Sequence, residues 1–160
     1  MQYPQLIILE SAGWVARQLA DWIRENRWLV REPRSPNGVL LHVREPRPTV
    51  VMIEIDPASD RSEAIALISR LHEQHSDLPL VAISDVKLPD TDRAVWTATL
   101  LDLGARYVLF PPVTQSVLED VASGLMEATI RRVVGGEASR IPPTPQPSSE
   151  GPIDLADMDD

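Results

Sequence analysis

Short apolar segments alternate along this chain with longer segments in which apolar residues recur at helical spacing. A near-continuous apolar run such as VVMI, at 50–53, is typical of a strand buried on both faces of a parallel sheet. The alternation predicts an α/β fold in which a doubly wound, five-stranded parallel sheet is covered by helices on both faces. The expected strands are 5–10, 28–32, 49–55, 78–84 and 107–110, and the expected helices cover about 11–26, 37–44, 91–103 and 114–134, with another opening at a capping pair formed by Asp60 and Glu63.

The C-terminal end differs in composition from the rest of the chain. Residues 137–160 contain six acids and one arginine, a local charge of −5, and prolines stand at 142, 143, 145, 147 and 152. Such a segment buries too little apolar surface to offset the entropy of ordering it. Gly135 and Gly136 are expected to end the last helix. We therefore predict one domain over residues 1–134 and a disordered, acidic, proline-rich tail over residues 135–160.

Charge and composition exclude several classes of protein. The net charge of −9 argues against a nucleic-acid-binding surface, which needs a basic patch. The absence of cysteine excludes disulfides and thiolate chemistry. No apolar run approaches the roughly 20 residues of a membrane helix, and the N-terminus lacks a basic region and carries Glu10 where a signal peptide would still be apolar. We expect a cytoplasmic protein that binds neither nucleic acid nor membranes.

Polar residues follow three of the predicted strands. Glu10 and Ser11 end the first strand, Glu54 and Asp56 follow the third, and Ser84 follows the fourth. In an open parallel sheet, ligands and chemistry collect at the carboxyl ends of the strands. The sequence therefore predicts one small polar cluster of carboxylates and a hydroxyl at that edge.

In the order and spacing of these residues, the chain over about 5–130 resembles the receiver domains of response regulators, the CheY-like family of two-component systems. That family ends its first strand with two aspartates, where this chain has Glu10-Ser11, and its third with the phospho-accepting aspartate, where it has Glu54. Ser84 matches the serine or threonine of the fourth strand, whereas Pro111 stands where the family has lysine. The resemblance implies a flavodoxin-like sheet with strand order 2-1-3-4-5.

The substitutions speak against the family's phosphotransfer chemistry. That chemistry needs a magnesium ion held by carboxylates, and Ser11 removes one acid from the set. Glu54 is a methylene longer than aspartate, and a misplacement of about 1 Å can cost on the order of a hundredfold in rate. No lysine follows the fifth strand, whether its position falls on Pro111 or, with a one-residue deletion, on Phe110. The expected site is therefore a degenerate phospho-acceptor site, as in a pseudo-receiver.

The expected function is that of a non-enzymatic signalling module that works through protein–protein interaction, without a cofactor. Its partner would be a histidine kinase or an effector, and a homodimer is a further alternative. Two other functions stay open: a genuine phospho-acceptor with an atypical site, which would require Mg²⁺, and a small nucleotide- or flavin-binding protein. Glu54 likewise has three interpretations: a carboxylate hydrogen-bonded to loop amides, a mimic of the phosphorylated state, or a residual site for metal or phosphate.

The resemblance also implies where a partner binds. In receiver domains, the fourth helix, fifth strand and fifth helix form the signalling surface. Here we expect that surface to carry Trp96, Leu100, Leu103 and Tyr107. The predicted helix over 91–103 is apolar on two sides, so its second apolar side either is deeply buried or faces a partner.

Overall fold

The structure, a computed structural model, describes residues 2–59 and 62–139. Its strands and helices alternate without exception, as the sequence predicts. The elements in chain order are β1 (Gln5–Leu9), α1 (Trp14–Asn26), β2 (Leu29–Arg31), α2 (Pro36–His42), β3 (Thr49–Glu54), α3 (Ser62–Gln74), β4 (Leu80–Ile83), α4 (Asp90–Leu103), β5 (Tyr107–Leu109) and α5 (Gln115–Ser139).

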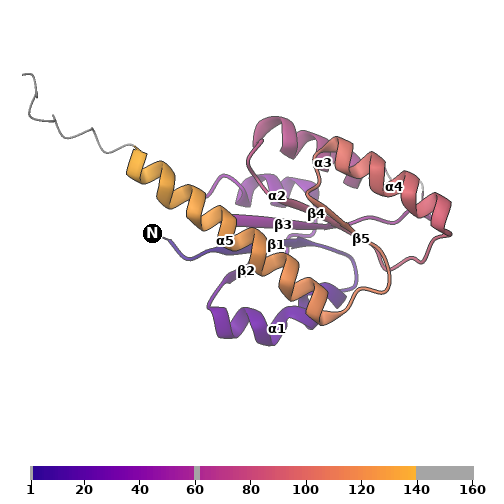
Figure 1. The fold of residues 1–160 in the computed structure, drawn as a ribbon, viewed down its shortest axis with the longest axis horizontal. Helices are drawn as coiled ribbons and strands as arrows, with labels where there is room; N and C mark the ends of the chain where they lie inside the picture. Colours follow the sequence, from indigo (N-terminus) through magenta and orange to yellow (C-terminus); the bar gives the residue numbers. More distant parts are fainter. Residues whose placement is uncertain (1, 60–61, 140–160) are drawn as a thin grey trace, which may run out of the picture.

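The five strands form one parallel sheet with the order β2-β1-β3-β4-β5. This confirms the strand order expected from the resemblance. Ile7 pairs with Val51 between β1 and β3, and Ile53 pairs with Ala82 between β3 and β4. Because all the strands run the same way, their carboxyl ends meet at one edge of the sheet (Figure 1).

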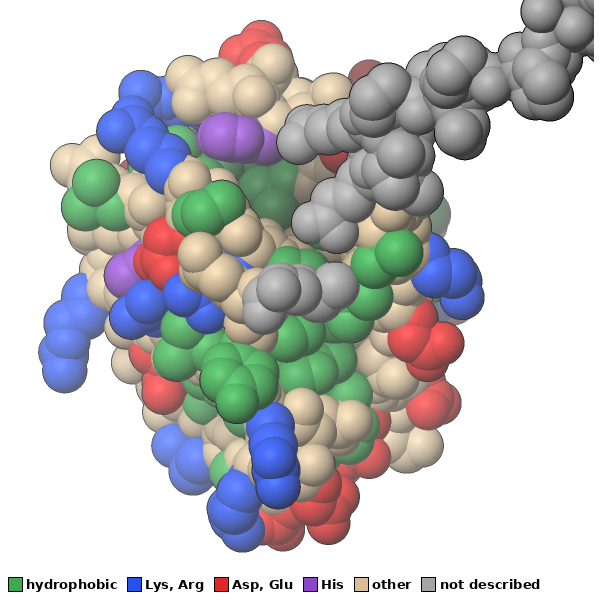
Figure 2. Space-filling model, turned by 90° about the vertical axis from the view of Figure 1, so that its left-hand side faces the viewer, with side chains coloured by type: hydrophobic (Ala, Val, Ile, Leu, Met, Phe, Trp, Pro, Cys, Tyr) green, Lys and Arg blue, Asp and Glu red, His purple; other side chains and the backbone are tan. Residues whose placement is uncertain are grey.

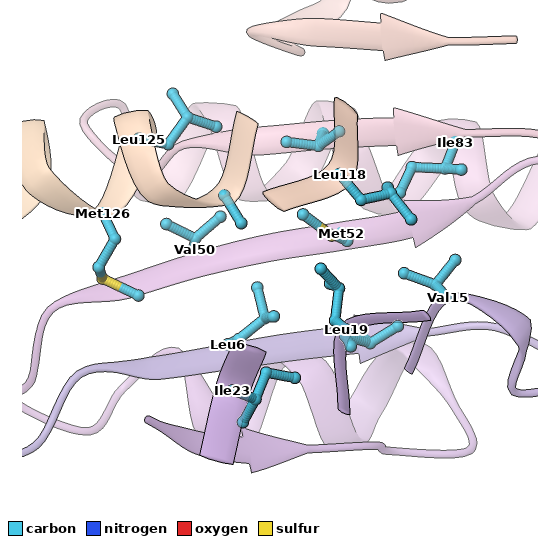
Figure 3. Packing of buried hydrophobic residues seen from close by; sticks show 13 residues of the cluster. Leu6, Val15, Leu19, Ile23, Val50, Met52, Ile83, Leu118, Leu125 and Met126 are labelled. Carbon is cyan, nitrogen blue, oxygen red and sulfur yellow. The ribbon is translucent and has the colours of Figure 1, made fainter. Parts of the chain in front are cut away.

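The sheet separates two apolar cores. Side chains alternate between its faces, so Leu6 and Ile8 of β1 belong to the core beneath α1 and α5, whereas Ile7 belongs to the core beneath α2, α3 and α4. Figure 3 shows the first core, with leucine, isoleucine, valine and methionine side chains from both helices meeting those of the strands. Each fully buried side chain of this size contributes about 1.5–3 kcal/mol.

The first helix begins three residues later than expected, at Trp14 rather than Ser11. Gly13 occupies the N-cap with a positive φ of 76°, so the chain turns there before the helix starts. The carboxylate of Glu10 accepts hydrogen bonds from the backbone N–H groups of Val15 and Ala16. Glu10 therefore caps the helix from outside it.

The last helix continues beyond the glycines that were expected to end it. α5 runs through Gly135 to Ser139, so the predicted end of the last helix at residue 134 is wrong. A glycine in a helix interior costs about 1 kcal/mol relative to alanine, which weakens a helix without stopping it. The predicted tail from residue 140 onward lies outside the described residues.

The two apolar sides of α4 lie opposite to the arrangement expected from the sequence. Leu100 is fully buried, and Trp96 and Leu103 are half-buried against the second core. Val95 and Leu101 are exposed instead, at 60% and 45% of their surface. The inclusion of Leu100 in an interaction surface is therefore wrong. The two sides are similarly apolar, so periodicity alone did not indicate which one faces the sheet.

Tyr107 at the start of β5 is 46% exposed, at the surface where it was expected. Within the described part of the chain, no helix is long and apolar enough to cross a membrane.

Candidate functional site

A cavity of about 440 Å³ opens at the edge of the sheet where the strands end. Five carboxylate side chains and one arginine lie among the described residues that form its wall. The lining residues are Leu9, Glu10, Ser11, Ala12, Arg34, Pro36, Glu54, Asp56, Glu63, Ala64 and Asp85.

Glu54 is the last residue of β3, and both of its carboxylate oxygens accept hydrogen bonds. Oε1 accepts from the backbone N–H of Ser11 at 2.9 Å and from the Ser11 hydroxyl at 3.1 Å. Oε2 accepts from the indole Nε1–H of Trp14 at 3.0 Å. Hydrogen bonds to an ionised carboxylate are roughly twice as strong as neutral ones. The Glu54 side chain is therefore held toward the loop between β1 and α1.

Glu10 faces the same cavity, but its carboxylate is also occupied. Oε1 accepts from the backbone N–H of Val15 at 2.9 Å, and Oε2 accepts from that of Ala16 at 3.0 Å. The first N–H groups of a helix have no intrahelical partner, and a negative charge beside them is favourable. The sequence placed Glu10 correctly at the site but did not predict this capping role.

Asp56 forms a turn in the loop after β3. Its Oδ1 accepts from the backbone N–H of Ala58 at 3.0 Å, and its backbone carbonyl accepts from the N–H of Ser59. These contacts are typical of an aspartate that shapes its own loop.

The structure places two of the predicted site residues away from the cavity wall. Ser84 is fully buried, and its hydroxyl oxygen accepts from the backbone N–H of Val86 at 3.0 Å. Pro111 follows β5 in a cis peptide bond with Pro112 and does not line the cavity. Phe110 packs against the second core, and Lys87, the only lysine in the sequence, is exposed on the loop after β4.

Sequence reasoning missed two side chains of this site. Trp14 was overlooked, although a buried indole N–H usually finds a hydrogen-bond acceptor. Trp14 begins α1, next to the acid that ends β3. Arg34 lies in the loop between β2 and α2, where no pattern in the sequence connects it with the ends of β1 and β3. It contributes the one cationic side chain in the described wall of the cavity.

The magnesium ion implied by the family does not fit the side chains as they are arranged here. Magnesium prefers carboxylate oxygens and water in an octahedron. The oxygens of Glu10 are directed at α1, those of Glu54 are directed at Ser11 and Trp14, and the second acid of the family's pair is replaced by serine. Among the described residues, no group of three or more histidine or acidic side chains is placed to hold a metal ion.

Comparison with known proteins shows a likeness in structure. No family model matches the sequence, and no curated protein matches it either. The receiver domain of NtrX from Brucella abortus is 21% identical with a TM-score of 0.60, over 76% of this chain and 98% of that chain. A CheY-like receiver domain protein from Methanospirillum hungatei JF-1 is 11% identical with a TM-score of 0.62, over 82% and 99%. The receiver domain of the Francisella response regulator 1452 is 16% identical with a TM-score of 0.60, over 79% and 98%.

At these identities the likeness shows the fold. A longer structure of NtrX, 21% identical with a TM-score of 0.63, is matched over 86% of this chain but over only 30% of its own length. This chain thus spans about 30% of that protein. Together with the observed strand order, the comparisons show that the chain has the fold of response-regulator receiver domains.

Proposed function

We propose that this chain is a receiver-like signalling module of two-component type that acts in the cytoplasm by binding a protein partner, without phosphorylation of Glu54. The observation that carries the proposal is the hydrogen bonding of Glu54, whose two oxygens accept three hydrogen bonds from Ser11 and Trp14. Transfer to this carboxylate would require an oxygen that already accepts a hydrogen bond to attack a phosphoryl group that carries negative charge of its own.

The electrostatics of the cavity support the same proposal. Catalysis of phosphoryl transfer depends on cations that neutralise the transferring oxygens. Five carboxylates face the cavity, and Arg34 is the one cation in its described wall. The same excess of negative charge disfavours a nucleotide or flavin, whose phosphates are anionic, so we do not propose that function.

A genuine phospho-acceptor is the second candidate, because Arg34 faces the same cavity as Glu54. An arginine binds phosphate oxygens through paired N–H donors and keeps its charge at any physiological pH. In this alternative, Arg34 would take the part of the missing lysine. The magnesium ion would still require Glu10 and Glu54 to give up their present hydrogen bonds.

Exposure of the full chain to a small-molecule phosphodonor with magnesium distinguishes the two candidates. We expect intact-mass measurement to show no phosphoryl adduct on the wild-type chain. A double variant, Ser11→Asp with Glu54→Asp, serves as the matched comparison because it restores two acids of the family pattern. A stoichiometric adduct on the wild-type chain that disappears in Glu54→Gln and in Arg34→Gln would replace our proposal with the second candidate.

The partner-binding surface is proposed at α4 and β5, on the exposed side that the structure defines. Val95, Leu101 and Tyr107 expose 60%, 45% and 46% of their surface there. Aromatic side chains such as Tyr107 often contribute 2 kcal/mol or more when they are truncated at the centre of an interface. The partner class is a kinase, an effector or a second copy of this chain.

A further inference from the structure

A second cavity, of about 430 Å³, lies at the opposite end of the molecule from the candidate site. It is formed where β3 and β4 begin, and the C-terminal half of α5 forms one side. Figure 2 looks onto this end, where apolar side chains are bordered by basic, histidine and acidic side chains. The lining residues are Val43, Arg47, Pro48, Thr49, Gln74, His75, Ser76, Asp77, Leu78, Pro79, Thr129, Arg132 and Val133, which we call the α5 groove.

The described wall of the α5 groove is more basic than acidic. Arg47, His75 and Arg132 line it, against the single acid Asp77. Arg132 donates from Nη2 to the backbone carbonyl oxygen of Asp77 at 2.6 Å, and no carboxylate of a described residue forms an ion pair with it. Its charge is therefore available to an acidic ligand, whereas Arg47 pairs with Glu45 at 3.1 Å.

Apolar side chains lie beside these cations. Val43, Leu78 and Val133 belong to the lining, together with two prolines. A groove of this kind suits a segment in which acidic and apolar residues alternate. Apolar side chains would contact the valines and leucine, while carboxylates would reach the arginines.

We propose that residues 150–160 of this same chain bind in the α5 groove. Their sequence, EGPIDLADMDD, carries five acids and no base, and Ile153, Leu155 and Met158 are interspersed among the acids. This segment has the charge opposite to that of the groove and the apolar residues to match its valines and leucine.

The chain is long enough for this contact. The helix α5 passes the groove at Arg132 and ends seven residues later at Ser139, about 10 Å further along its axis at 1.5 Å per residue. Residues 140–149, ten in number, span up to about 33 Å when extended. The connecting segment can therefore turn back from the end of α5 to the groove.

Covalent connection makes even a weak contact effective. A chain that can span two sites makes their contact intramolecular, at an effective concentration that can reach the millimolar range. An electrostatic contact that is too weak to form between separate molecules can then form in a substantial fraction of single chains. A partner that binds the acidic segment or the groove would have to displace it, which makes the contact a regulatory device independent of Glu54.

A spin label tests the contact in the full chain. Because the sequence has no cysteine, Ser149→Cys gives a single labelling position next to the segment without altering it. We expect the label to broaden the amide signals of groove residues such as Leu78 and Thr129 selectively. The broadening should be lost in Arg132→Glu and near 1 M salt, where the Debye length is only about 3 Å.

Arg131→Glu is the matched control, because Arg131 is exposed on the same turn of α5 but does not line the groove. It should leave the broadening in place. The proposal is overturned if the label broadens no groove signal, or if Arg131→Glu and Arg132→Glu act alike. Broadening seen only when labelled chains are mixed with separately isotope-labelled chains would also overturn it, because the contact would then be intermolecular.

Discussion

Trp14 donates its indole Nε1–H to Oε2 of Glu54 at 3.0 Å, which ties the first residue of α1 to the last residue of β3. Ser11 completes the arrangement on the other carboxylate oxygen. The Glu54 carboxylate is thus hydrogen-bonded within the chain, and Ser11 donates from the position where receiver domains have the second acid.

The Trp14–Glu54 bond should be measurable as a coupling energy. Trp14→Phe removes the donor and keeps a ring, and Glu54→Gln removes the charge and keeps the shape. A hydrogen bond to a charged group contributes about 1.5–3 kcal/mol, and the partial exposure of this pair places our expectation at about 1 kcal/mol. A double-mutant cycle in denaturant melts measures it. Additive effects of the two substitutions would show that the bond contributes nothing to stability.

Glu10 should stabilise α1 through the N–H groups of Val15 and Ala16. Glu10→Ala removes both acceptors and the negative charge at the helix N-terminus. Loss of a cap costs about 0.5–2 kcal/mol, and we expect a value of about 1 kcal/mol or more in urea unfolding. Glu25→Ala is the control, since Glu25 is an exposed acid in the last turn of the same helix. Equal losses in the two variants would contradict the capping role.

Substitution of two adjacent leucines of α4 should change the free energy of unfolding by very different amounts. Leu100 is fully buried, so Leu100→Ala should lower the free energy of unfolding by about 2–5 kcal/mol. Leu101 is 45% exposed, so Leu101→Ala should change it by only about 0.5 kcal/mol. Denaturant melts of the two variants measure both values.

Partner binding gives these variants a second use. If the exposed side of α4 is the interaction surface, Leu101→Ala should weaken partner capture or self-association, measured by pull-down with a candidate kinase and by light scattering. Unchanged binding in Leu101→Ala, Val95→Ala and Tyr107→Ala alike would remove this surface from the proposed function.

Two glycines should give changes of opposite sign on substitution by alanine. Gly104 has a φ of 125°, and a Cβ placed there would collide with the Cβ and ring of His72. Gly104→Ala should therefore lower the free energy of unfolding by about 1–3 kcal/mol. Gly124 lies in the interior of α5 with nothing within 4 Å of an added Cβ. Gly124→Ala should therefore raise the free energy of unfolding by about 0.5–1 kcal/mol. Thermal unfolding of both variants provides the measurement.

The sequence predicted the alternation of strands and helices because the strands are mostly short apolar runs, whereas the strand order followed from the resemblance to receiver domains. It also placed Glu10, Ser11 and Glu54 at one cavity, since the carboxyl ends of parallel strands share an edge. The sequence did not predict the contacts of those side chains. The carboxylate of Glu10 reaches the N–H groups of α1 because the chain turns at Gly13, and the helix therefore begins three residues later than the periodicity suggested.

The errors have physical causes of their own. The helix α4 is apolar on two sides, so its orientation follows from how it packs on the sheet rather than from its pattern. The glycines at 135 and 136 resemble a helix stop, yet α5 continues through them. Trp14 reaches the site from the start of α1 and Arg34 from the loop between β2 and α2, and only the folded arrangement brings them to the ends of β1 and β3.

The last prediction concerns acid stability and Glu45, in the loop between α2 and β3. The pKa of the Glu45 carboxyl is lowered from its ordinary value, chiefly by a hydrogen bond with the His42 side chain. Burial, the next largest effect, raises the pKa, and hydrogen bonding and charge from Arg31 and the charge of Arg47 lower it further. His42 Nδ1 lies 3.1 Å from Glu45 Oε2, and Arg31 Nη2 lies 3.1 Å from Oε1. This carboxyl therefore binds its proton less readily in the folded state than in the unfolded state.

A carboxyl whose pKa is lowered by folding contributes stability above its unfolded pKa, about 4.3 for glutamate, and that contribution is lost as the pH falls through the folded value. Glu45→Gln should thus be less stable than wild type at neutral pH, and the difference should shrink as the pH drops below about 4.3. Glu32→Gln is the control, because Glu32 is an exposed glutamate that directly follows β2. Its free energy of unfolding should differ less from that of wild type at every pH. Urea unfolding at a series of pH values from neutral to acidic decides the matter, and a Glu45→Gln difference that grows toward acid would contradict the sign argued here.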